Sequence, residues 1–248
     1  MQRPSGQRAE VGRTTASPLR PWWRRRRYWV PLAAIWIAAA VALLAWRYWL
    51  PQYRPGLQAG ESYGVDVSTH QGHIDWEDVA RDDIEFAFIK ATEGGDLVDA
   101  RFVENWRGAR QAGIDVGAYH FFTLCRSGED QAANFLSQLP RLESDLAPAL
   151  DLEFPGNCSE RPPVEWVQRE VRTWVGLVEE KTGLEVLLYV QGDFDEAYRI
   201  TPMFDRPVWH RRILRRPSEN EWLVWQLSYF ADVEGIDGGV DLNVGRFG

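Results

Sequence analysis

The sequence has 248 residues, of which 45% are hydrophobic, so it is long enough for one or two folded domains and too apolar for a disordered or fibrous protein. Its formal charge of -8 is unevenly spread, because residues 1–60 hold ten of the 28 basic residues and only one of the 36 acidic ones. The rest of the chain therefore carries a net charge of -17, which argues against a nucleic-acid partner, since phosphate binding needs a positive surface.

The first expected element is a transmembrane helix at residues 28–46, a run of 19 residues without a charge. A helix needs about 20 apolar residues to cross a bilayer, and Trp and Tyr at both ends of the run suit the membrane interfaces. Arg24–Arg27 precede the run, whereas only two arginines follow it closely, so the positive-inside rule keeps the N-terminus in the cytoplasm. We expect a basic cytoplasmic arm at 1–27, a Pro/Gly linker at 47–61 and an extracytoplasmic domain at 62–248.

Residues 28–46 have two other interpretations, a cleaved signal peptide and a buried core helix. The apolar region of a signal peptide usually spans about 7 to 15 residues, which is shorter than this run. A core helix of a soluble protein would keep a polar face, which this run lacks. We therefore expect a retained, single-pass anchor whose partner is the lipid bilayer.

From residue 62 onward, the pattern alternates between strands and helices. Helices are clearest at 98–112, closed by Gly113, and at 163–182, closed by Gly183. Strands that alternate with helices indicate a parallel sheet, and eight of them suggest a closed barrel. Because the connections between the last three strands show little helical signal, we expect an irregular α/β barrel with helices missing near the C-terminus. The expected strands are residues 63–68, 84–91, 114–122, 146–154, 184–191, 206–213, 221–228 and 239–244.

Acidic residues recur in these strands. Asp151 and Glu153, in ALDLEF, point to the same side of one strand, where their repulsion must raise at least one pKa. A fold tolerates that cost most readily at a working site. With Asp66 and Asp241 from two other strands, we expect all four acids near the C-terminal strand ends, where barrel enzymes hold catalytic groups. The alternative for any single strand-end Asp is a turn former.

Six segments resemble, in order and spacing, the muramidases of glycoside hydrolase family 25. The resemblance covers residues 62–248 and implies the family's irregular barrel. It also implies hydrolysis of the β-1,4 bond from N-acetylmuramic acid to N-acetylglucosamine in peptidoglycan, with no cofactor and no metal. The segments are YGVDVSTHQGHIDW (63–76), FAFIKATEG (86–94), FVENWRGARQAGIDVGAYHFF (102–122), PALDLEF (148–154), VWQLS (224–228) and GIDGGVDLNV (235–244).

The resemblance also assigns roles to the acids. Glu153 falls on the family's proton donor and Asp151 on its partner, while Asp66 and Asp241 fall on two further catalytic positions. The spacing of Asp151 and Glu153 leaves retaining and inverting mechanisms open. A third route, which we favour, is substrate-assisted: the sugar's 2-acetamido group attacks its own anomeric carbon while Asp151 orients and charge-stabilises it.

A sugar groove is expected beside the acids. His120 could equally be an interior histidine, but the family's YHF pattern favours the groove. The chain departs from the family at 208–218, VWHRRILRRPS, where many members have a WIA-type segment, so groove contacts from this strand are in doubt. This basic segment is either an exposed charged loop or a site for anionic wall polymer or a lipid surface. The expected groove residues are Lys90, Glu93, Tyr119, His120, Tyr189, Trp225 and Gln226.

Two other classes of function remain possible. A non-catalytic module could bind peptidoglycan in the same groove, but the retained Asp151 and Glu153 argue against it. A calcium site could use clustered carboxylates, but no loop has the alternating acidic spacing of a calcium motif.

The two cysteines, Cys125 and Cys158, lie just beyond two strands that we expect to be neighbours. Outside the cytoplasm they would pair, because free thiols on exposed loops are a liability there. We therefore expect a Cys125–Cys158 disulfide; the alternative is two unrelated thiols.

Overall fold

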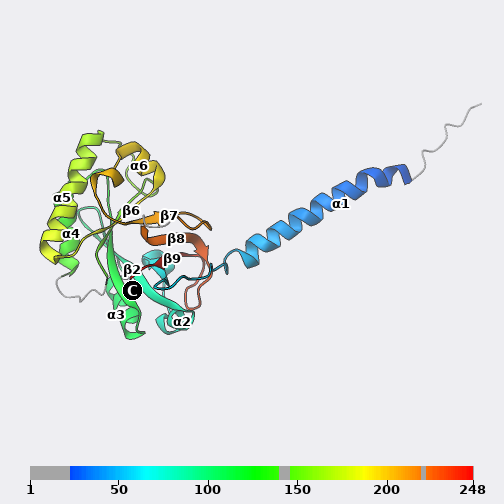
Figure 1. Cartoon of the computed structure of the whole chain (residues 1–248), viewed down its shortest axis with the longest axis horizontal. Coiled ribbons are helices and arrows are strands. Elements are labelled where there is room, and N and C mark those ends of the chain that lie inside the picture. The colour runs from blue at the N-terminus through cyan, green and yellow to red at the C-terminus, as the bar shows by residue number, and fades with distance from the viewer. Residues whose placement is uncertain (1–22, 140–145, 219–221, 248) are drawn as a thin grey trace, which may run out of the picture. The chain divides into compact units, whose positions relative to one another are not determined.

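The computed structural model describes residues 23–139, 146–218 and 222–247, which belong to two compact units, Met1–Arg47 and Tyr48–Gly248 (Figure 1). Helix α1 (Trp23–Leu44) lies in the first unit and is followed by a π-helix at Ala45–Trp49, whose last two residues belong to the second unit. The segment Trp29–Trp49 has a mean hydropathy of 2.1 and is long and apolar enough to cross a membrane. The expected span at 28–46 thus lies on a helix, whereas most of the expected arm, residues 1–22, lies outside the described residues.

The second unit is a closed barrel of eight strands, as expected from the sequence. Each barrel strand from β1 to β8 runs parallel to the next one around the barrel, and the short strand β3 (Leu97–Val98) pairs antiparallel with the end of β2. The last strand pairs with both β8 and β1 and closes the barrel. The barrel strands are β1 (Ser62–Val67), β2 (Ile84–Glu93), β4 (Asp115–Phe121), β5 (Ala149–Leu152), β6 (Leu187–Val190), β7 (Val208–Arg211), β8 (Trp222–Ala231) and β9 (Val240–Gly245).

Strand β9 corrects one expectation, because it runs antiparallel to both of its neighbours. Asp241 is therefore the second residue of its strand and does not lie near the strand's C-terminal end. The reversed direction still brings it to the same end of the barrel as the other acids, since Asp66 of β1 is its register partner.

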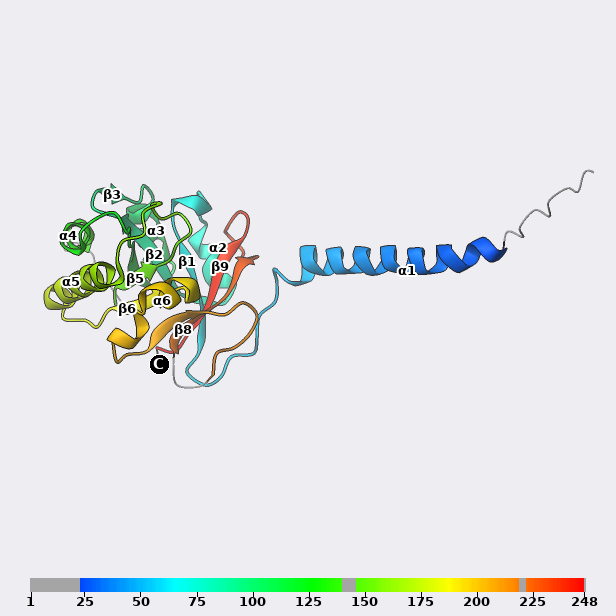
Figure 2. The same ribbon diagram turned by 90° about the horizontal axis from the view of Figure 1, so that it is seen from above.

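Helices cover the outside of the first part of the barrel (Figures 1 and 2). The predicted helix at 163–182 is α5, which ends at Gly183 in the left-handed conformation that glycine adopts readily. The helix predicted at 98–112 is α3, and three further helices, α2, α4 and α6, occupy connections for which no helix bounds were predicted. No helix occurs in the described residues of the connections after β7 and β8. The helices are α2 (Trp76–Arg81), α3 (Phe102–Gln111), α4 (Gly128–Gln138), α5 (Val164–Thr182) and α6 (Gly192–Tyr198).

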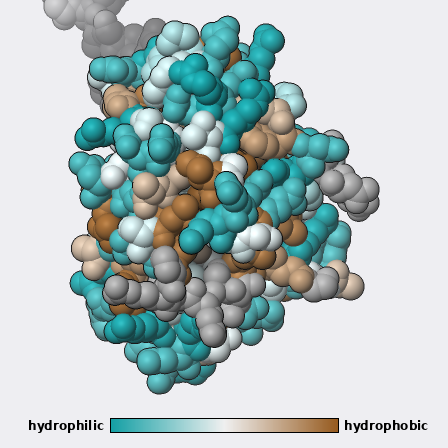
Figure 3. Space-filling model, turned by 90° about the vertical axis from the view of Figure 1, so that its left-hand side faces the viewer, coloured by the Kyte–Doolittle hydropathy of each residue, from teal (hydrophilic) through white to brown (hydrophobic). Residues whose placement is uncertain are grey.

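The helical layer is amphipathic. Helix α5 buries Val167, Val171 and Trp174, which recur at the three- to four-residue spacing of one helix face. Figure 3 shows the side of the molecule where α4 and α5 lie in Figure 1, and hydrophilic residues cover most of that face. The apolar core therefore lies between these helices and the outer face of the strands.

The barrel interior is filled at one end and open at the other. Phe86 and Phe88 point inward from β2, and glycines on the neighbouring strands make room for their rings. A Cβ atom on Gly64 would lie 2.3 Å from the Phe86 ring, and one on Gly117 would lie 2.5 Å from Phe88. This packed layer closes one end of the barrel, so inward-facing polar residues further along the strands surround a cavity.

The linker is attached to the barrel. The backbone amide of Asp232 donates to the carbonyl of Pro51 at 2.8 Å. The guanidinium of Arg54 donates to the backbone carbonyl of Asp82 at 2.6 Å and also forms an ion pair with its carboxylate. Residues 51–61 therefore belong to the folded unit.

Candidate active site

A cavity of about 510 Å³ opens where the parallel strands end. It brings together all four acids that the sequence singled out: Asp66 from β1, Asp151 and Glu153 from β5 and its following residue, and Asp241 from β9. Five of the seven expected groove residues also line it, namely Lys90, Glu93, Tyr119, Tyr189 and Gln226.

Asp66 and Asp241 form one pair of acids in this cavity. Burial and the charge of Asp241 raise the pKa of Asp66 well above its usual value, although a 2.8 Å hydrogen bond from Asn243 opposes this shift. Burial also raises the pKa of Asp241 to about 6, against the opposing effects of Arg211 and of a hydrogen bond with Asp66. Burial and the neighbouring charge therefore favour the protonated form of Asp66, whereas Asp241, with a pKa of about 6, is mostly ionised at neutral pH.

Asp151 and Glu153 form the second pair. Burial raises the pKa of Glu153 to about 7; Asp241 adds to the rise, while Arg211 and Lys90 oppose it. Burial and the charge of Glu153 raise the pKa of Asp151 well above its usual value. The Oδ1 atom of Asp151 is buried and has no hydrogen-bond partner among the described residues. The cavity thus holds one acid that titrates near neutrality beside one unfilled hydrogen-bond acceptor.

A chain of hydrogen bonds links the two pairs of acids. The amide of Gln191 donates to Glu153 and, at 3.3 Å, to the hydroxyl of Tyr189. Tyr189 donates in turn to Gln226 at 3.0 Å, and the amide of Gln226 lies 3.5 Å from Asp66. These contacts hold the side chains of the cavity wall in fixed orientations.

Lys90 and Glu93 are an ion pair at the edge of the cavity, with 2.7 Å between Nζ and Oε2. Residues three apart normally face opposite sides of a strand. The pairing of β2 with β4 shifts register between Lys90 and Thr92, and such a bulge returns Glu93 to the inner face. Lys90 also lies 4.7 Å from the centroid of the Phe121 ring.

Comparison with known families decides the class of the protein. The profile of glycosyl hydrolases family 25 matches residues 65–236, which is more than half of the chain. The chain belongs to glycosyl hydrolase family 25. It is therefore a glycoside hydrolase, as the resemblance implied.

Relatives of this family 25 hydrolase include proteins from two bacteria. It is 36% identical over 190 residues to YegX of Escherichia coli, which covers 73% of this chain and 68% of YegX. It is 32% identical over 197 residues to lysozyme M1 of Streptomyces globisporus, covering 73% and 66% of the two chains. Among solved structures, a family 25 glycosyl hydrolase from Bacillus anthracis is 35% identical with a TM-score of 0.68, over 79% of this chain and 94% of that chain.

His120, expected in the groove, lies outside the cavity of this family 25 hydrolase. It is fully buried on the outer face of β4, within 2.7 Å of the Thr92 hydroxyl and 3.2 Å of Gln131, and it stacks on Trp174. Burial lowers its pKa to about 3, so the ring is neutral. Because neighbours on a strand face opposite sides, Tyr119 lines the cavity and His120 cannot.

Trp225 also lies outside the cavity, for the same reason. Its neighbour Gln226 faces inward, while the Trp225 indole packs in the core outside the barrel and donates to the carbonyl of Arg212 at 2.7 Å. Of the expected groove residues, Tyr119 and Gln226 therefore face the cavity, whereas their chain neighbours His120 and Trp225 do not.

Sequence reasoning missed several residues of the site. Trp209 lines the cavity, although its segment departs from the family pattern. Its indole N–H donates a hydrogen bond to the side-chain oxygen of Asn243 at 2.9 Å. Strand alternation could have found Gln191 and Asn243, because each lies two residues beyond a cavity residue. Further missed residues that line the cavity are Ser68, His70, Gln71 and Phe121.

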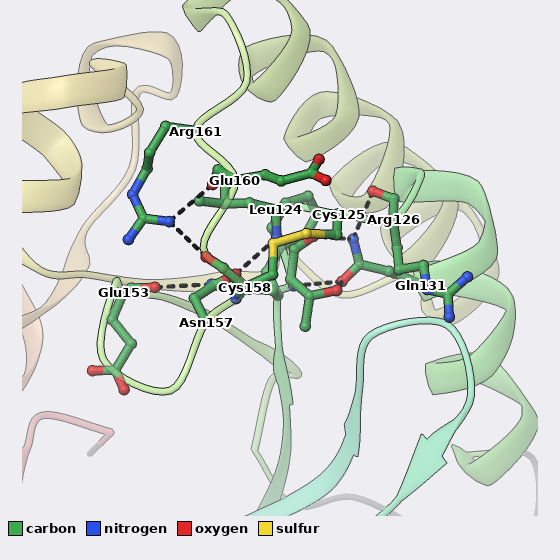
Figure 4. The surroundings of a disulfide bond; sticks show 11 residues. Leu124, Cys125, Arg126, Gln131, Glu153, Asn157, Cys158, Glu160 and Arg161 are labelled. Carbon is green, nitrogen blue, oxygen red and sulfur yellow. Dashed lines mark hydrogen bonds between the residues drawn. A yellow bond between two sulfur atoms is a disulfide. The ribbon is translucent and has the colours of Figure 1, made fainter.

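The expected disulfide between Cys125 and Cys158 is present, with 6.3 Å between the Cα atoms (Figure 4). Beside it, the Asn157 amide donates to the carbonyls of Phe122 and Glu153 at 2.8 and 2.9 Å. Its side-chain oxygen accepts from the amide of Leu124 at 2.9 Å. The disulfide and Asn157 together tie the loop after Glu153 to the loop after β4.

Proposed function

We propose that this family 25 hydrolase cleaves the β-1,4 bond from N-acetylmuramic acid to N-acetylglucosamine in peptidoglycan. Its relative from Streptomyces globisporus is by name a lysozyme, which supports this substrate. The observation that carries the proposal is the pair on β5: Glu153, whose pKa is about 7, beside Asp151, whose Oδ1 has no partner among the described residues.

Glu153 is the proposed general acid. A glycosidic oxygen leaves as a hydroxyl only if a proton reaches it, so the donor must be protonated at working pH. An ordinary Glu is almost fully ionised at pH 7, whereas a group with a pKa of about 7 is half protonated there. Burial therefore keeps a fraction of Glu153 protonated near neutral pH, as a general acid requires.

Asp151 is the proposed stabiliser of the substrate's 2-acetamido group. The N–H of that group would supply the hydrogen bond that Oδ1 lacks, orienting the acetamido oxygen toward the anomeric carbon. That hydrogen bond and the positive charge that develops in the transition state both favour the ionised form of Asp151. Attack by the acetamido oxygen then proceeds as Glu153 protonates the leaving oxygen.

The proposed location is the outer side of a membrane. The helix at Trp29–Trp49 is long and apolar enough to serve as an anchor, and the arginines before it favour a cytoplasmic N-terminus. The barrel would then face the compartment that contains peptidoglycan.

The test compares three forms of the full chain in detergent: wild type, Glu153→Gln and Glu160→Gln. Glu160 is exposed and lies on the same loop, so it controls for loss of a nearby charge. We expect Glu153→Gln to bind glycan strands yet lose about 10²- to 10⁴-fold in the release of reducing ends. Wild-type turnover by Glu153→Gln would refute the assignment. Binding of glycan strands without hydrolysis by the wild type would favour a non-catalytic binding module.

A further inference from the structure

Arg211 lies at the rim of the cavity, at the end of β7. Trp209, two residues earlier, lines the cavity, and strand alternation places Arg211 on the same face. Its register partner on β8 is Gln226, which also lines the cavity. The Arg211 side chain is exposed, and its guanidinium lies 5.3 Å from the centroid of the Tyr229 ring, a contact that holds a cation in place.

No carboxylate among the described residues forms a salt bridge with Arg211. Its positive charge nevertheless lowers the pKa values of Glu153 and Asp241, so the guanidinium acts on both acids across the mouth of the cavity. No hydrogen bond from a described residue occupies its guanidinium, so the donors can bind a group from outside. Arg216, in the same basic segment, differs because it is paired with Glu61 at 2.6 Å.

The lining of the cavity is acidic. Its described residues include five acidic side chains, Asp66, Glu93, Asp151, Glu153 and Asp241, but a single lysine, Lys90. Asp241, which is mostly ionised at neutral pH, and the ionised fraction of Glu153 repel an anionic substrate unless a cation stands at the point of entry.

We propose that Arg211 binds a carboxylate carried by the muramic acid unit of the substrate and thereby selects acidic glycan strands over neutral ones. This inference rests on the function proposed above. A guanidinium binds a carboxylate through two parallel hydrogen bonds, which fix position as well as supply affinity. The carboxylate is either that of the lactyl ether, in strands without peptides, or one on the stem peptide; the chemistry of recognition is the same.

Three soluble glycan strands distinguish these sources. The first carries acidic stem peptides, the second is free of peptides and exposes the lactyl carboxylate, and the third is free of peptides with that carboxylate converted to a neutral methylamide. The full chain in detergent is assayed as wild type, Arg211→Gln, Arg211→Lys and Arg212→Gln. Arg212 is exposed, carries the same charge and follows the last residue of β7, so its variant is the matched control.

We expect Arg211→Gln to lower kcat/KM about 10- to 100-fold on at least one carboxylate-bearing strand. The ratio of kcat/KM on that strand to kcat/KM on the neutral strand should then be near one. The strand that shows the loss identifies the source of the carboxylate, and Arg211→Lys should restore part of the ratio. Removing Arg211 also raises the pKa of Glu153, but that effect changes all three rates together and cancels in the ratio.

An equal effect of Arg211→Gln on charged and neutral strands would overturn the proposal, and so would an equal effect of Arg212→Gln on the ratio. Hydrolysis of all three strands by the wild type with no preference would overturn it while leaving the proposed function intact. Failure of the wild type to cleave any of the strands would instead refute the proposed function, and this inference with it.

Discussion

Asp66 and Asp241 lie directly opposite each other on the antiparallel strands β1 and β9, facing the same cavity as Asp151 and Glu153. Two carboxyl groups this close cannot both ionise without cost, and burial raises that cost further. Asn243 and Trp209 support the pair from the barrel wall. The Trp209 indole donates to the amide oxygen of Asn243, and the amide nitrogen of Asn243 donates to Asp66. The folded protein therefore favours the protonated forms of these acids, and this affects both stability and activity.

Stability should fall as the pH rises from about 4 to about 7. The folded-state pKa of Asp241 is about 6, above its usual value of 3.8, so the folded protein holds a proton that the unfolded chain releases in this range. The stability that this proton contributes is complete below pH 3.8 and is lost as the pH rises through 6. Asp241→Asn should flatten the decline in Tm measured by calorimetry, whereas the exposed control Asp237→Asn should not. If Tm declined equally with pH in the wild type and in Asp241→Asn, the raised pKa of Asp241 would be contradicted.

The rate should depend on the protonated form of Glu153. Because its pKa is about 7, we expect kcat/KM to decline tenfold per unit once the pH exceeds about 7. Gln191→Leu removes a donor to the Glu153 carboxylate, which favours the protonated form and should move this decline to higher pH. Rates measured from pH 5 to 9 on the proposed substrate test both points. An unchanged profile in Gln191→Leu would show that the hydrogen bond does not control the acid.

Asp151→Asn should be severely impaired, because the positive charge that develops at the anomeric carbon would lose its stabiliser. The measurement is kcat/KM on glycan strands, with folding checked by circular dichroism. Retention of more than about a tenth of the wild-type rate, a loss below about 1.4 kcal/mol, would make Asp151 a bystander. A substrate without its acetamido group should lose rate in the wild type and show little further loss in Asp151→Asn.

Breaking the disulfide should destabilise the barrel. The bond joins residues 33 apart in the sequence, and closing a loop of this size is worth about 3 to 4 kcal/mol in the chain-entropy model. Cys125→Ser combined with Cys158→Ser should lower the free energy of unfolding in urea by about that amount. The reduced wild type should match this double variant. Two reactive thiols in the denatured, unreduced protein would show that the bond does not form in the cell.

Protease added to spheroplasts should remove the barrel from the outer face of the membrane. The charge bias across residues 28–46 predicts this orientation. Resistance until the membrane is lysed would reverse the topology. Release of the intact barrel from the membrane by alkaline extraction, with the apolar helix absent, would instead show that the segment is a cleaved signal.

Much of the fold could be predicted from local patterns. The apolar run, the strand segments, the helix closed by Gly183 and the acidic pair Asp151 and Glu153 each follow from the spacing of side chains along the chain. The Cys125–Cys158 pairing followed from strand adjacency in the expected barrel, and it is confirmed. The family's motifs supplied the order of these parts, since their spacing along the chain matches a single architecture.

Only the tertiary structure decided the direction of β9, the face on which His120 and Trp225 lie, and the pKa values of the acids. Strand direction depends on pairing between distant segments, which no local pattern records. Burial sets each pKa, and it depends on every strand that surrounds a side chain: Glu153 titrates near 7 because the barrel removes water from it, with Arg211 and Asp241 acting on it from strands more than 50 residues further along the chain. The sequence by itself determined which chemical groups the site contains, and the closed barrel determined which of them meet and in which protonation state.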